Sequence, residues 1–185
     1  DLCVDMFDGT NWIKTCGMKP VGTVTDPNHN TPDSWAYRNN LNLSRSHAIS
    51  FTIGNKEYIS TGGIDNMPFY YDDLWEYDPS TNTLTQRANF PGGGRGQAVG
   101  FSIGNKGYLC TGNSGTYVNY DLWEYDPAAD TWTSKAQLPG SARKAAQGIS
   151  IGNKGYVGLG TDGGSDLNDW WEYNPSTDTW TQKAN

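Results

Sequence analysis

The feature that most constrains this 185-residue chain is a unit of 48 to 50 residues that occurs three times in register. Each copy opens on an I-G-N-K-x-Y segment and continues to a W-E-Y-[DN]-P segment. The matching pairs are FTIGNKEYISTGG (51–63) with DLWEYDP (73–79), FSIGNKGYLCTGN (101–113) with DLWEYDP (121–127), and ISIGNKGYVGLGT (149–161) with DWWEYNP (169–175). A period of this length indicates one supersecondary unit whose copies bury a core by stacking on one another.

Recurring Trp and Arg residues fix the register of the units. They are Trp75, Trp123 and Trp171, each 48 residues apart, and Arg45, Arg95 and Arg143, which are 50 and 48 residues apart. The two additional residues of the first interval fall in the connection ANFPGGG (88–94). We therefore predict repeats at about 41–88, 89–136 and 137–185, and an outer strand at 34–39 ahead of them.

Each unit contains four short segments typical of strands, as the second copy illustrates. QAVGFSI (97–103) is small and apolar, which favours an inner strand buried on both faces. Gly104-Asn105 suits a type II′ hairpin turn into GYLCTG (107–112), because only glycine takes a positive φ there cheaply. DLWEY (121–125) and the alternating TWTSK (131–135) follow, separated by a Pro- and Asp-containing turn. Four strands in so short a unit predict an all-β fold.

These residues together resemble the kelch repeat, and the resemblance covers residues 34–185. It rests on the glycines after the second strand, the Trp and Tyr of WEYDP, the Trp of TWT and the recurring Arg. The sequence of the repeats is most similar to that of kelch proteins secreted by Bacteroidetes-type bacteria. The resemblance implies a kelch-type β-propeller, or an open propeller segment, of four-stranded antiparallel blades, and implies no particular chemistry. Because they recur, we expect structural roles for Arg45, Arg95, Arg143, Trp75, Trp123, Trp171, Gly62 and Gly112, and for the carboxylates Asp73, Asp121 and Asp169.

The first 33 residues allow two interpretations. In one, CVDMF and WIKTC form a β-hairpin in which Cys3 faces Cys16 across the strands. In the other, Gly9–Gly17 matches Gly104–Gly112 and the segment is a degenerate first blade, with Trp35 in its outer strand. Both interpretations permit a Cys3–Cys16 disulfide, which requires an oxidising compartment.

Composition limits the partners and the location. The net charge of −7, with 13 Lys and Arg against 20 Asp and Glu, gives little support for binding nucleic acid. A run of about 18 apolar residues, as a membrane span requires, is missing from the sequence. The abrupt start at Asp1 suggests a processed or truncated chain. With the resemblance and the cysteines, these observations favour an extracellular protein, secreted or at the cell surface.

Three repeats make an incomplete ring, since propellers close with about four to eight blades. An open arc would expose apolar end faces and unpaired strand edges. We therefore expect either further blades from a longer chain or self-association, which includes head-to-tail growth into a filament.

Catalytic groups are scarce in the sequence. His29 and His47 are the only histidines, and neither a Ser/Cys–His–Asp pattern nor a metal-binding spacing such as C-x-x-C is present. We predict no catalytic residue, no resident metal and no cofactor. Cys110 stands where the other copies have Ser60 and Gly158, which indicates a small buried thiol.

The loops that differ between copies are the better candidates for a site. They span 64–72, 113–120 and 161–168, and strand order places them on one face. The candidate ligand-binding residues are Tyr70, Tyr71, Tyr117, Tyr120, Asp65, Asn66, Asn119 and Asp166. Aromatic planes beside carboxylates and amides suit a protein or glycan partner, although the same loops would also fit ordinary solvated turns. Asp162, Asp166 and Asp169 offer a weaker possibility of Ca²⁺ binding.

We therefore predict an extracellular, non-catalytic binding or assembly module, such as an adhesin-like scaffold at the cell surface or a filament subunit. The alternative is a kelch-type sugar-processing enzyme, isomerase-like, with a central pocket. That enzyme would need a closed ring with convergent polar groups at the mouth of its channel.

Overall fold

The computed structural model describes residues 3–7, 12–16, 38–41, 43–64 and 69–183, and the chain divides into two units, Asp1–Tyr37 and Arg38–Asn185. In the first unit, β1 (Cys3–Phe7) pairs antiparallel with β2 (Trp12–Cys16). Their register sets Cys3 opposite Cys16, as the hairpin interpretation predicts. The disulfide stays a prediction, because the side chains of this unit are outside the described part. The rest of the degenerate-blade interpretation, including Trp35, lies outside the described residues, as does most of the outer strand expected at 34–39.

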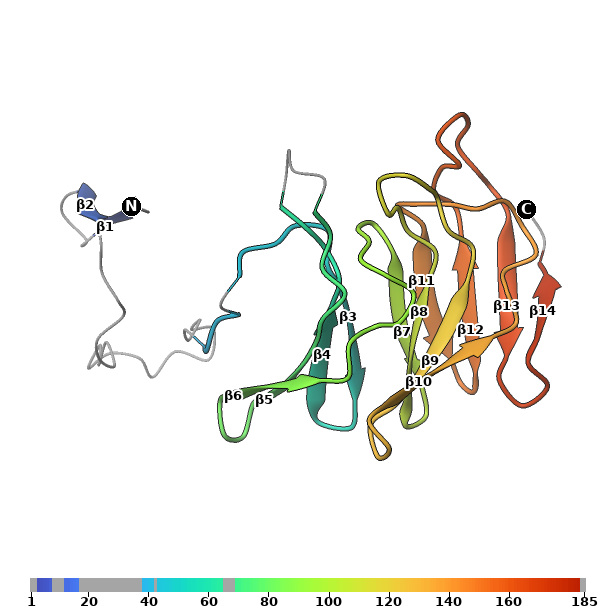
Figure 1. Cartoon of the computed structure of the whole chain (residues 1–185), viewed down its shortest axis with the longest axis horizontal. Coiled ribbons are helices and arrows are strands. Elements are labelled where there is room, and N and C mark those ends of the chain that lie inside the picture. The colour runs from blue at the N-terminus through green and yellow to red at the C-terminus, as the bar shows by residue number, and fades with distance from the viewer. Residues whose placement is uncertain (1–2, 8–11, 17–37, 42, 65–68, 184–185) are drawn as a thin grey trace. The chain divides into compact units, whose positions relative to one another are not determined.

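The second unit consists of three four-stranded antiparallel sheets, each formed by consecutive strands (Figure 1). The first sheet is β3 (Ile49–Ile53), β4 (Lys56–Ser60), β5 (Leu74–Asp78) and β6 (Thr83–Arg87); the second is β7 (Val99–Ile103), β8 (Lys106–Cys110), β9 (Leu122–Asp126) and β10 (Thr131–Lys135); the third is β11 (Gln147–Ile151), β12 (Lys154–Gly158), β13 (Trp170–Asn174) and β14 (Thr179–Gln182). The described residues contain no helix, so the all-β prediction is confirmed for them.

The Gly-Asn turns between the first two strands of each sheet form as the sequence predicts. Gly54, Gly104 and Gly152 have φ of +62°, +60° and +60°. The asparagine that follows each of them is not among the described residues with positive φ, which distinguishes a type II′ turn from a type I′ turn. The tight turn therefore fixes the register of the hairpin in every copy.

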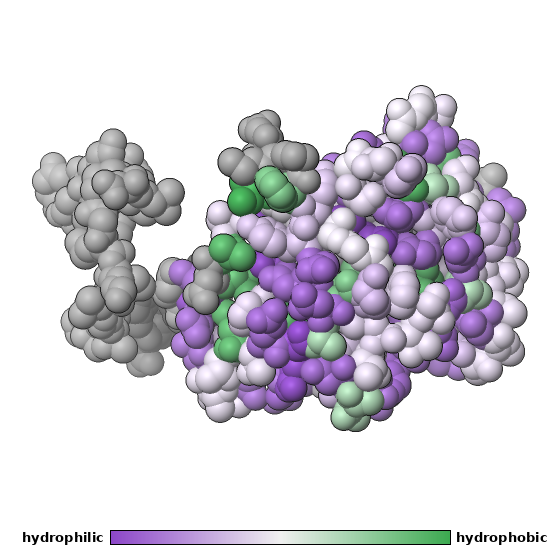
Figure 2. Space-filling model, in the orientation of Figure 1, coloured by the Kyte–Doolittle hydropathy of each residue, from purple (hydrophilic) through white to green (hydrophobic). Residues whose placement is uncertain are grey.

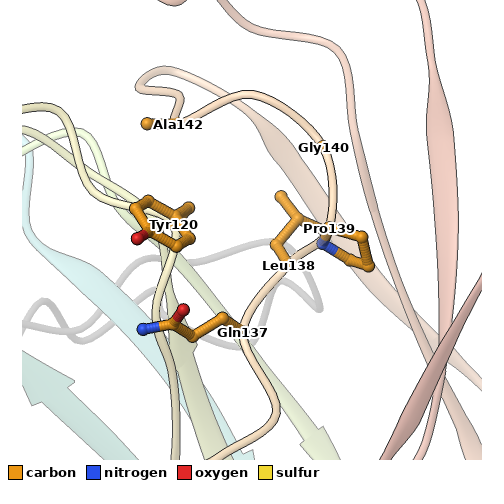
Figure 3. A pocket seen from close by; sticks show the side chains of 6 residues that line it. All are labelled: Tyr120, Gln137, Leu138, Pro139, Gly140 and Ala142. Carbon is orange, nitrogen blue, oxygen red and sulfur yellow. The ribbon is translucent and has the colours of Figure 1, made fainter.

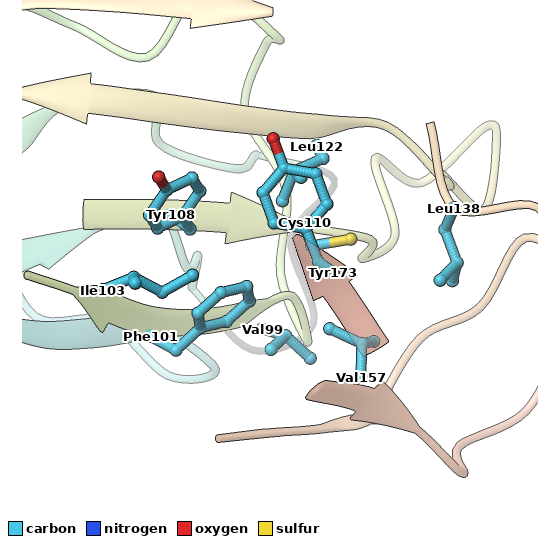
Figure 4. Packing of buried hydrophobic residues seen from close by; sticks show 9 residues of the cluster. All are labelled: Val99, Phe101, Ile103, Tyr108, Cys110, Leu122, Leu138, Val157 and Tyr173. Carbon is cyan, nitrogen blue, oxygen red and sulfur yellow. The ribbon is translucent and has the colours of Figure 1, made fainter. Parts of the chain in front are cut away.

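The core lies between successive sheets rather than within one. Ile49, Phe51 and Tyr58 of the first sheet pack against Leu109 and Tyr125 of the second. The cluster between the second and third sheets repeats this arrangement, and Figure 4 shows Val99, Phe101 and Tyr108 beside Val157 and Tyr173. Burial of these side chains is the main force that holds one sheet on the next.

Glycine allows the sheets to approach closely. A Cβ atom on Gly107 would collide with the ring of Phe51, and one on Gly155 would collide with the ring of Phe101. Each phenylalanine also stacks on a tyrosine of its own sheet, with ring centroids 5.5 Å apart for Phe51–Tyr58 and 5.4 Å for Phe101–Tyr108. A large ring on one sheet thus fills the space that the next sheet leaves open.

The inner strands are not equally covered, which corrects one expectation. We predicted burial on both faces for all three, but only β7 lies between two sheets. In β3 the residues Ser50 and Thr52 are exposed, and in β11 Ile149 and Ile151 are exposed. The apolar pattern of these strands identifies the strand type, and the neighbouring sheets decide whether both faces are buried.

Candidate functional site

The loops that vary between copies lie at one edge of the three sheets, and the tight turns lie at the opposite edge (Figure 1). The base of each loop continues the ladder through isolated bridges: Ser46 to Gly63 to Tyr70, Gly96 to Asn113 to Val118, and Lys144 to Thr161 to Asp166. The loops therefore share one backbone frame and differ in their tips, which is the arrangement in which binding residues usually occur.

An Arg–Asp–Trp cluster supports the base of each loop. In the second sheet, Arg95 donates to both carboxylate oxygens of Asp121, from Nη1 over 2.6 Å and from Nη2 over 3.0 Å. Its Nη1 also donates to the carbonyl oxygen of Thr111 over 2.9 Å, and the indole of Trp123 donates to Asp121 over 2.8 Å. The guanidinium is buried, and bidentate pairing compensates for the loss of its water shell.

The other sheets repeat the cluster with Arg45–Asp73–Trp75 and Arg143–Asp169–Trp171. Hydrogen bonds from Arg143 hold the pKa of Asp169 below its usual value, because they stabilise the carboxylate. Burial works to raise the pKa of Asp73, but the hydrogen bonds from Arg45 and Trp75 outweigh it and lower that pKa as well. The clusters are ion pairs that organise each sheet, consistent with the structural roles expected for their residues.

The arginines also contribute to the contact between sheets, although not through their side chains. Each side chain pairs with the aspartate of its own sheet. The connection to the preceding sheet runs through the backbone. The N–H of Gly62 donates to the carbonyl oxygen of Arg95 over 2.8 Å, and that of Gly112 donates to Arg143 over 2.9 Å.

The four candidate tyrosines separate into two kinds. The side chains of Tyr117 and Tyr120 reach solvent, with 71% and 44% of their surface exposed. Tyr70 instead packs beside Gly96, where a Cβ atom would lie 2.8 Å from its ring, and Tyr71 lies 4.6 Å beneath the guanidinium of Arg45. Tyr70 and Tyr71 therefore serve the packing of the loop base, and the second loop presents the accessible rings.

The polar candidates do not form a cluster. Asn119 donates from its side chain to the carbonyl oxygen of Gly112 over 3.2 Å and accepts from the backbone of Arg143, so it shapes the loop. Asp166 is exposed and bridges to Thr161. Asp65 and Asn66 lie outside the described residues. In place of a Ca²⁺ site, Asp162 accepts from the backbone of Gly164 and Ser165, while Asp169 pairs with Arg143.

A hollow of about 370 Å³ lies beside Tyr120, and the sequence did not predict it (Figure 3). The connection between the second and third sheets forms its other side; its lining is Tyr120, Gln137, Leu138, Pro139, Gly140 and Ala142. Buried Leu138 provides an apolar floor, and the Tyr120 hydroxyl and the Gln137 amide provide polar groups. Sequence reasoning also missed Phe69, which is 67% exposed at the same edge. The connections between successive sheets, which contain Pro91-Gly92 and Pro139-Gly140, differ between copies, and this variation was the signal that would have indicated the hollow.

Reactive groups are few in the part of the chain that the structure describes. His47 takes a positive φ of +56°, and its Nδ1 lies 3.1 Å from the Oγ of Ser46. Cys110 is buried in the core, as predicted, and burial raises the pKa of its thiol, which keeps it protonated. Among the described residues, His, Cys, Asp and Glu form no group of three suited to a metal ion. No helix that could span a membrane occurs there either.

Comparison with known proteins gives a likeness in solved structures, which concerns the fold. Neither a protein-family model nor a curated protein matches the chain. The solved structure of YjhT matches with a TM-score of 0.66 and 20% sequence identity over 76% of this chain and 52% of that one. The chain thus spans about half the length of YjhT, and the likeness supports a shared arrangement of β-sheets.

Proposed function

We propose that this chain is a kelch-type β-propeller segment that serves as an extracellular binding module. Three equivalent sheets packed face to face, with β7 between β3 and β11, support a propeller-like arrangement. The recurring Arg–Asp–Trp clusters beneath the loops support the kelch assignment, because they give the kelch-like residues a common structural role.

The observation that carries the binding role is the exposed ring of Tyr120, which lines the hollow, together with Tyr117 and Phe69, which are exposed on the loops of the same edge. Tyr117 and Tyr120 belong to the second loop, whose base is held by the Gly96–Asn113–Val118 bridges and the Arg95–Asp121 ion pair, so their presentation costs little ordering on binding. Aromatic rings with one polar atom supply flat contact area and an orienting hydrogen bond. The volume of the hollow falls in the range of about 300–1,000 Å³ typical of ligand pockets.

The chemistry of this edge favours a glycan or a protein side chain as its ligand. Tyr120 offers a ring for stacking on the apolar face of a sugar, and Gln137 offers an amide for its hydroxyls. The net charge of −7 disfavours strongly acidic glycans. A neutral glycan, or a protein carrying a neutral or basic side chain, is therefore the ligand class we propose.

Binding to a glycan array by the wild-type chain and by Tyr120→Ala tests this role. We expect the variant to lose about tenfold or more in affinity, the scale of a lost hot-spot contact. Thr133→Ala, an exposed position on β10, is the matched control and leaves binding unchanged. Equal binding by the two variants would remove Tyr120 from the site, and a chain that binds neither the array nor surface proteins would contradict the proposal.

The extracellular location depends on the kelch resemblance and on the register that sets Cys3 opposite Cys16. Thiol labelling of the denatured protein, with and without prior reduction, tests the Cys3–Cys16 disulfide that this location would allow. We expect one reactive thiol, from Cys110, before reduction and three after it. Three thiols before reduction of the oxidatively purified protein would count against the disulfide. We do not propose the sugar-processing enzyme, because no feature of the described residues specifically favours it.

A further inference from the structure

The two outer faces of the stack of three sheets differ from the faces that meet inside it. The third-sheet end face comprises Gln147, Ile149, Ile151, Tyr156 and Trp170. Ile149 and Ile151 are 48% and 60% exposed there, whereas their counterparts in the second sheet, Phe101 and Ile103, are 5% and 7% exposed. This face therefore exposes apolar side chains at positions that are covered by the next sheet in the second sheet.

The first-sheet end face, at the other side of the stack, carries a matching hollow. It comprises Leu41, Ser50, Glu57, Ile59, Tyr77 and Leu84. A cavity of about 360 Å³ lies at this face, and the segment that precedes the first sheet forms part of its wall; its lining is Arg38, Asn39, Asn40, Leu41, Leu43, Arg45, Ile59, Tyr77 and Leu84. The counterparts of Ile59 and Tyr77 in the other sheets are Leu109 with Tyr125 and Val157 with Tyr173, all of which are fully buried by the preceding sheet. Figure 2 shows hydrophobic areas among hydrophilic ones toward this end of the coloured surface.

The end faces depart from the internal pattern at the same contact positions. Inside the stack, a large ring opposes a glycine, as Phe51 opposes Gly107 and Phe101 opposes Gly155. At the ends, the third sheet has the smaller Ile149 in the ring position, and the first sheet has the larger Glu57 in the glycine position. The loss of volume on one face accompanies a gain of volume on the other.

A second contact changes in the same concerted way. Ile49 opposes Gly100, and Val99 opposes Gly148, so an aliphatic side chain meets a glycine at both internal contacts. The end faces have Gln147 and Ser50 at these two positions, so both become polar together. Matched changes on two faces that do not touch within one molecule are expected where the faces meet between molecules.

The backbone of the third sheet also preserves the geometry of an internal contact. Gly62 and Gly112, with φ of +80° and +102°, donate to the arginine carbonyl oxygens of the next sheet. Gly160 occupies the same position in the third sheet, with φ of +81°. The third sheet therefore keeps, at this position, the left-handed backbone conformation from which the first and second sheets donate to the following sheet.

We propose that the third-sheet end face of one copy binds the first-sheet end face of a second copy, and that two copies close into a ring of six sheets. Six lies within the range of about four to eight blades that propellers use. The matching part, 76% of this chain, also covers 52% of YjhT, so two copies of that part correspond to about the whole of that protein. A head-to-tail contact that closes gives a discrete particle rather than a filament. This self-association is independent of ligand binding at the loop edge.

Light scattering after size-exclusion chromatography, over a series of protein concentrations, tests the stoichiometry. We expect a particle of twice the 20.3 kDa chain mass that dissociates on dilution. A single-chain mass at every concentration would overturn the contact, and an open series of larger particles would overturn the closed pair.

Complementary variants test the direction of the contact. Ile151→Asp damages the third-sheet face, and Ile59→Asp damages the first-sheet face, so each variant alone is expected to be monomeric. A mixture of the two restores a pair, because the intact third-sheet face of one variant meets the intact first-sheet face of the other. Recovery in the mixture supports the proposal, and a dimer that only one of the two substitutions abolishes indicates like-with-like contact and overturns it.

Two further variants keep this test independent of folding. Leu43→Asp changes an exposed residue that lines the first-sheet hollow and replaces Ile59→Asp if that variant fails to fold. Tyr117→Asp introduces the same charge at the loop edge and is expected to leave the dimer intact. Loss of the dimer in Tyr117→Asp would show that added charge alone dissociates it, and the assignment of the end faces would fail.

Discussion

The second and third sheets have nearly the same internal construction and very different surroundings. Their Arg–Asp contacts are both 2.6 Å at the shortest, and their Trp side chains bond the same aspartates. The second sheet is covered on both faces, whereas the inner strand of the third sheet exposes Ile149 and Ile151. The comparison shows that local hydrogen bonds determine the shape of a sheet, while its neighbours determine how much apolar surface it buries.

The largest expected difference between these sheets comes from truncating equivalent core positions. Phe101→Ala is expected to destabilise the chain by about 3–5 kcal/mol, because it leaves a cavity between two sheets. Ile149→Ala, in monomeric protein, is expected to cost under about 1 kcal/mol, as exposed substitutions do. Urea unfolding followed by tryptophan fluorescence measures both. Similar losses for the two variants would show that the third-sheet face is covered in solution.

Removing the buried arginine should affect the two sheets equally. Arg95→Met and Arg143→Met each leave an aspartate without its bidentate partner, at an expected cost of about 3 kcal/mol in the free energy of unfolding. Lys135→Met is the control, because its amino group lies 3.7 Å from Glu124 in a partly exposed pair worth about 0–1 kcal/mol. Clearly unequal losses for the two arginine variants would contradict the view that each cluster acts within its own sheet.

Adding one methyl group at the contact between the sheets should have an intermediate effect. Gly155→Ala places a Cβ atom against the ring of Phe101 and is expected to destabilise by about 1–3 kcal/mol through overpacking. Glu57→Ala occupies the equivalent position in the first sheet, where no preceding repeat sheet is described. It is expected to change stability by less than about 0.5 kcal/mol. Differential scanning calorimetry of both variants checks this contrast.

Acid should weaken the third sheet through Asp169, with the smallest effect of the four. Because hydrogen bonds from Arg143 lower the folded-state pKa of this carboxyl, its contribution is fully present above the unfolded pKa of about 4. It is lost as the pH falls below that value through the folded pKa. Urea midpoints at decreasing pH are expected to fall less steeply for Asp169→Asn than for the wild type. Parallel pH profiles would show that this carboxyl does not contribute.

Most of the strands and turns could be predicted from the sequence, because the residue patterns that specify them are local. The Gly-Asn pairs specify tight turns, and the alternation of apolar residues specifies strands, so the segment around Gly104 could be placed without its neighbours. The recurrence of Arg95 and Asp121 indicated a structural role, although the pairing of the arginine within its own sheet was not predicted. The exposed tyrosines of the second loop were identified, but Tyr70 and Tyr71 were grouped with them because a loop sequence does not reveal packing.

The amino-acid sequence by itself determined the all-β character, the repeat register and the Gly-Asn turns of the sheets, because these depend on contacts between residues close in the chain. Only the tertiary structure decided which faces are buried, where the hollow beside Tyr120 lies, and which aromatic rings reach solvent. The physical reason is that identical apolar strands become core or surface according to whether another sheet packs on them. That Glu57 and Ile149 lie at contact positions can be recognised only by comparison with the internal contacts of Gly107 and Phe101.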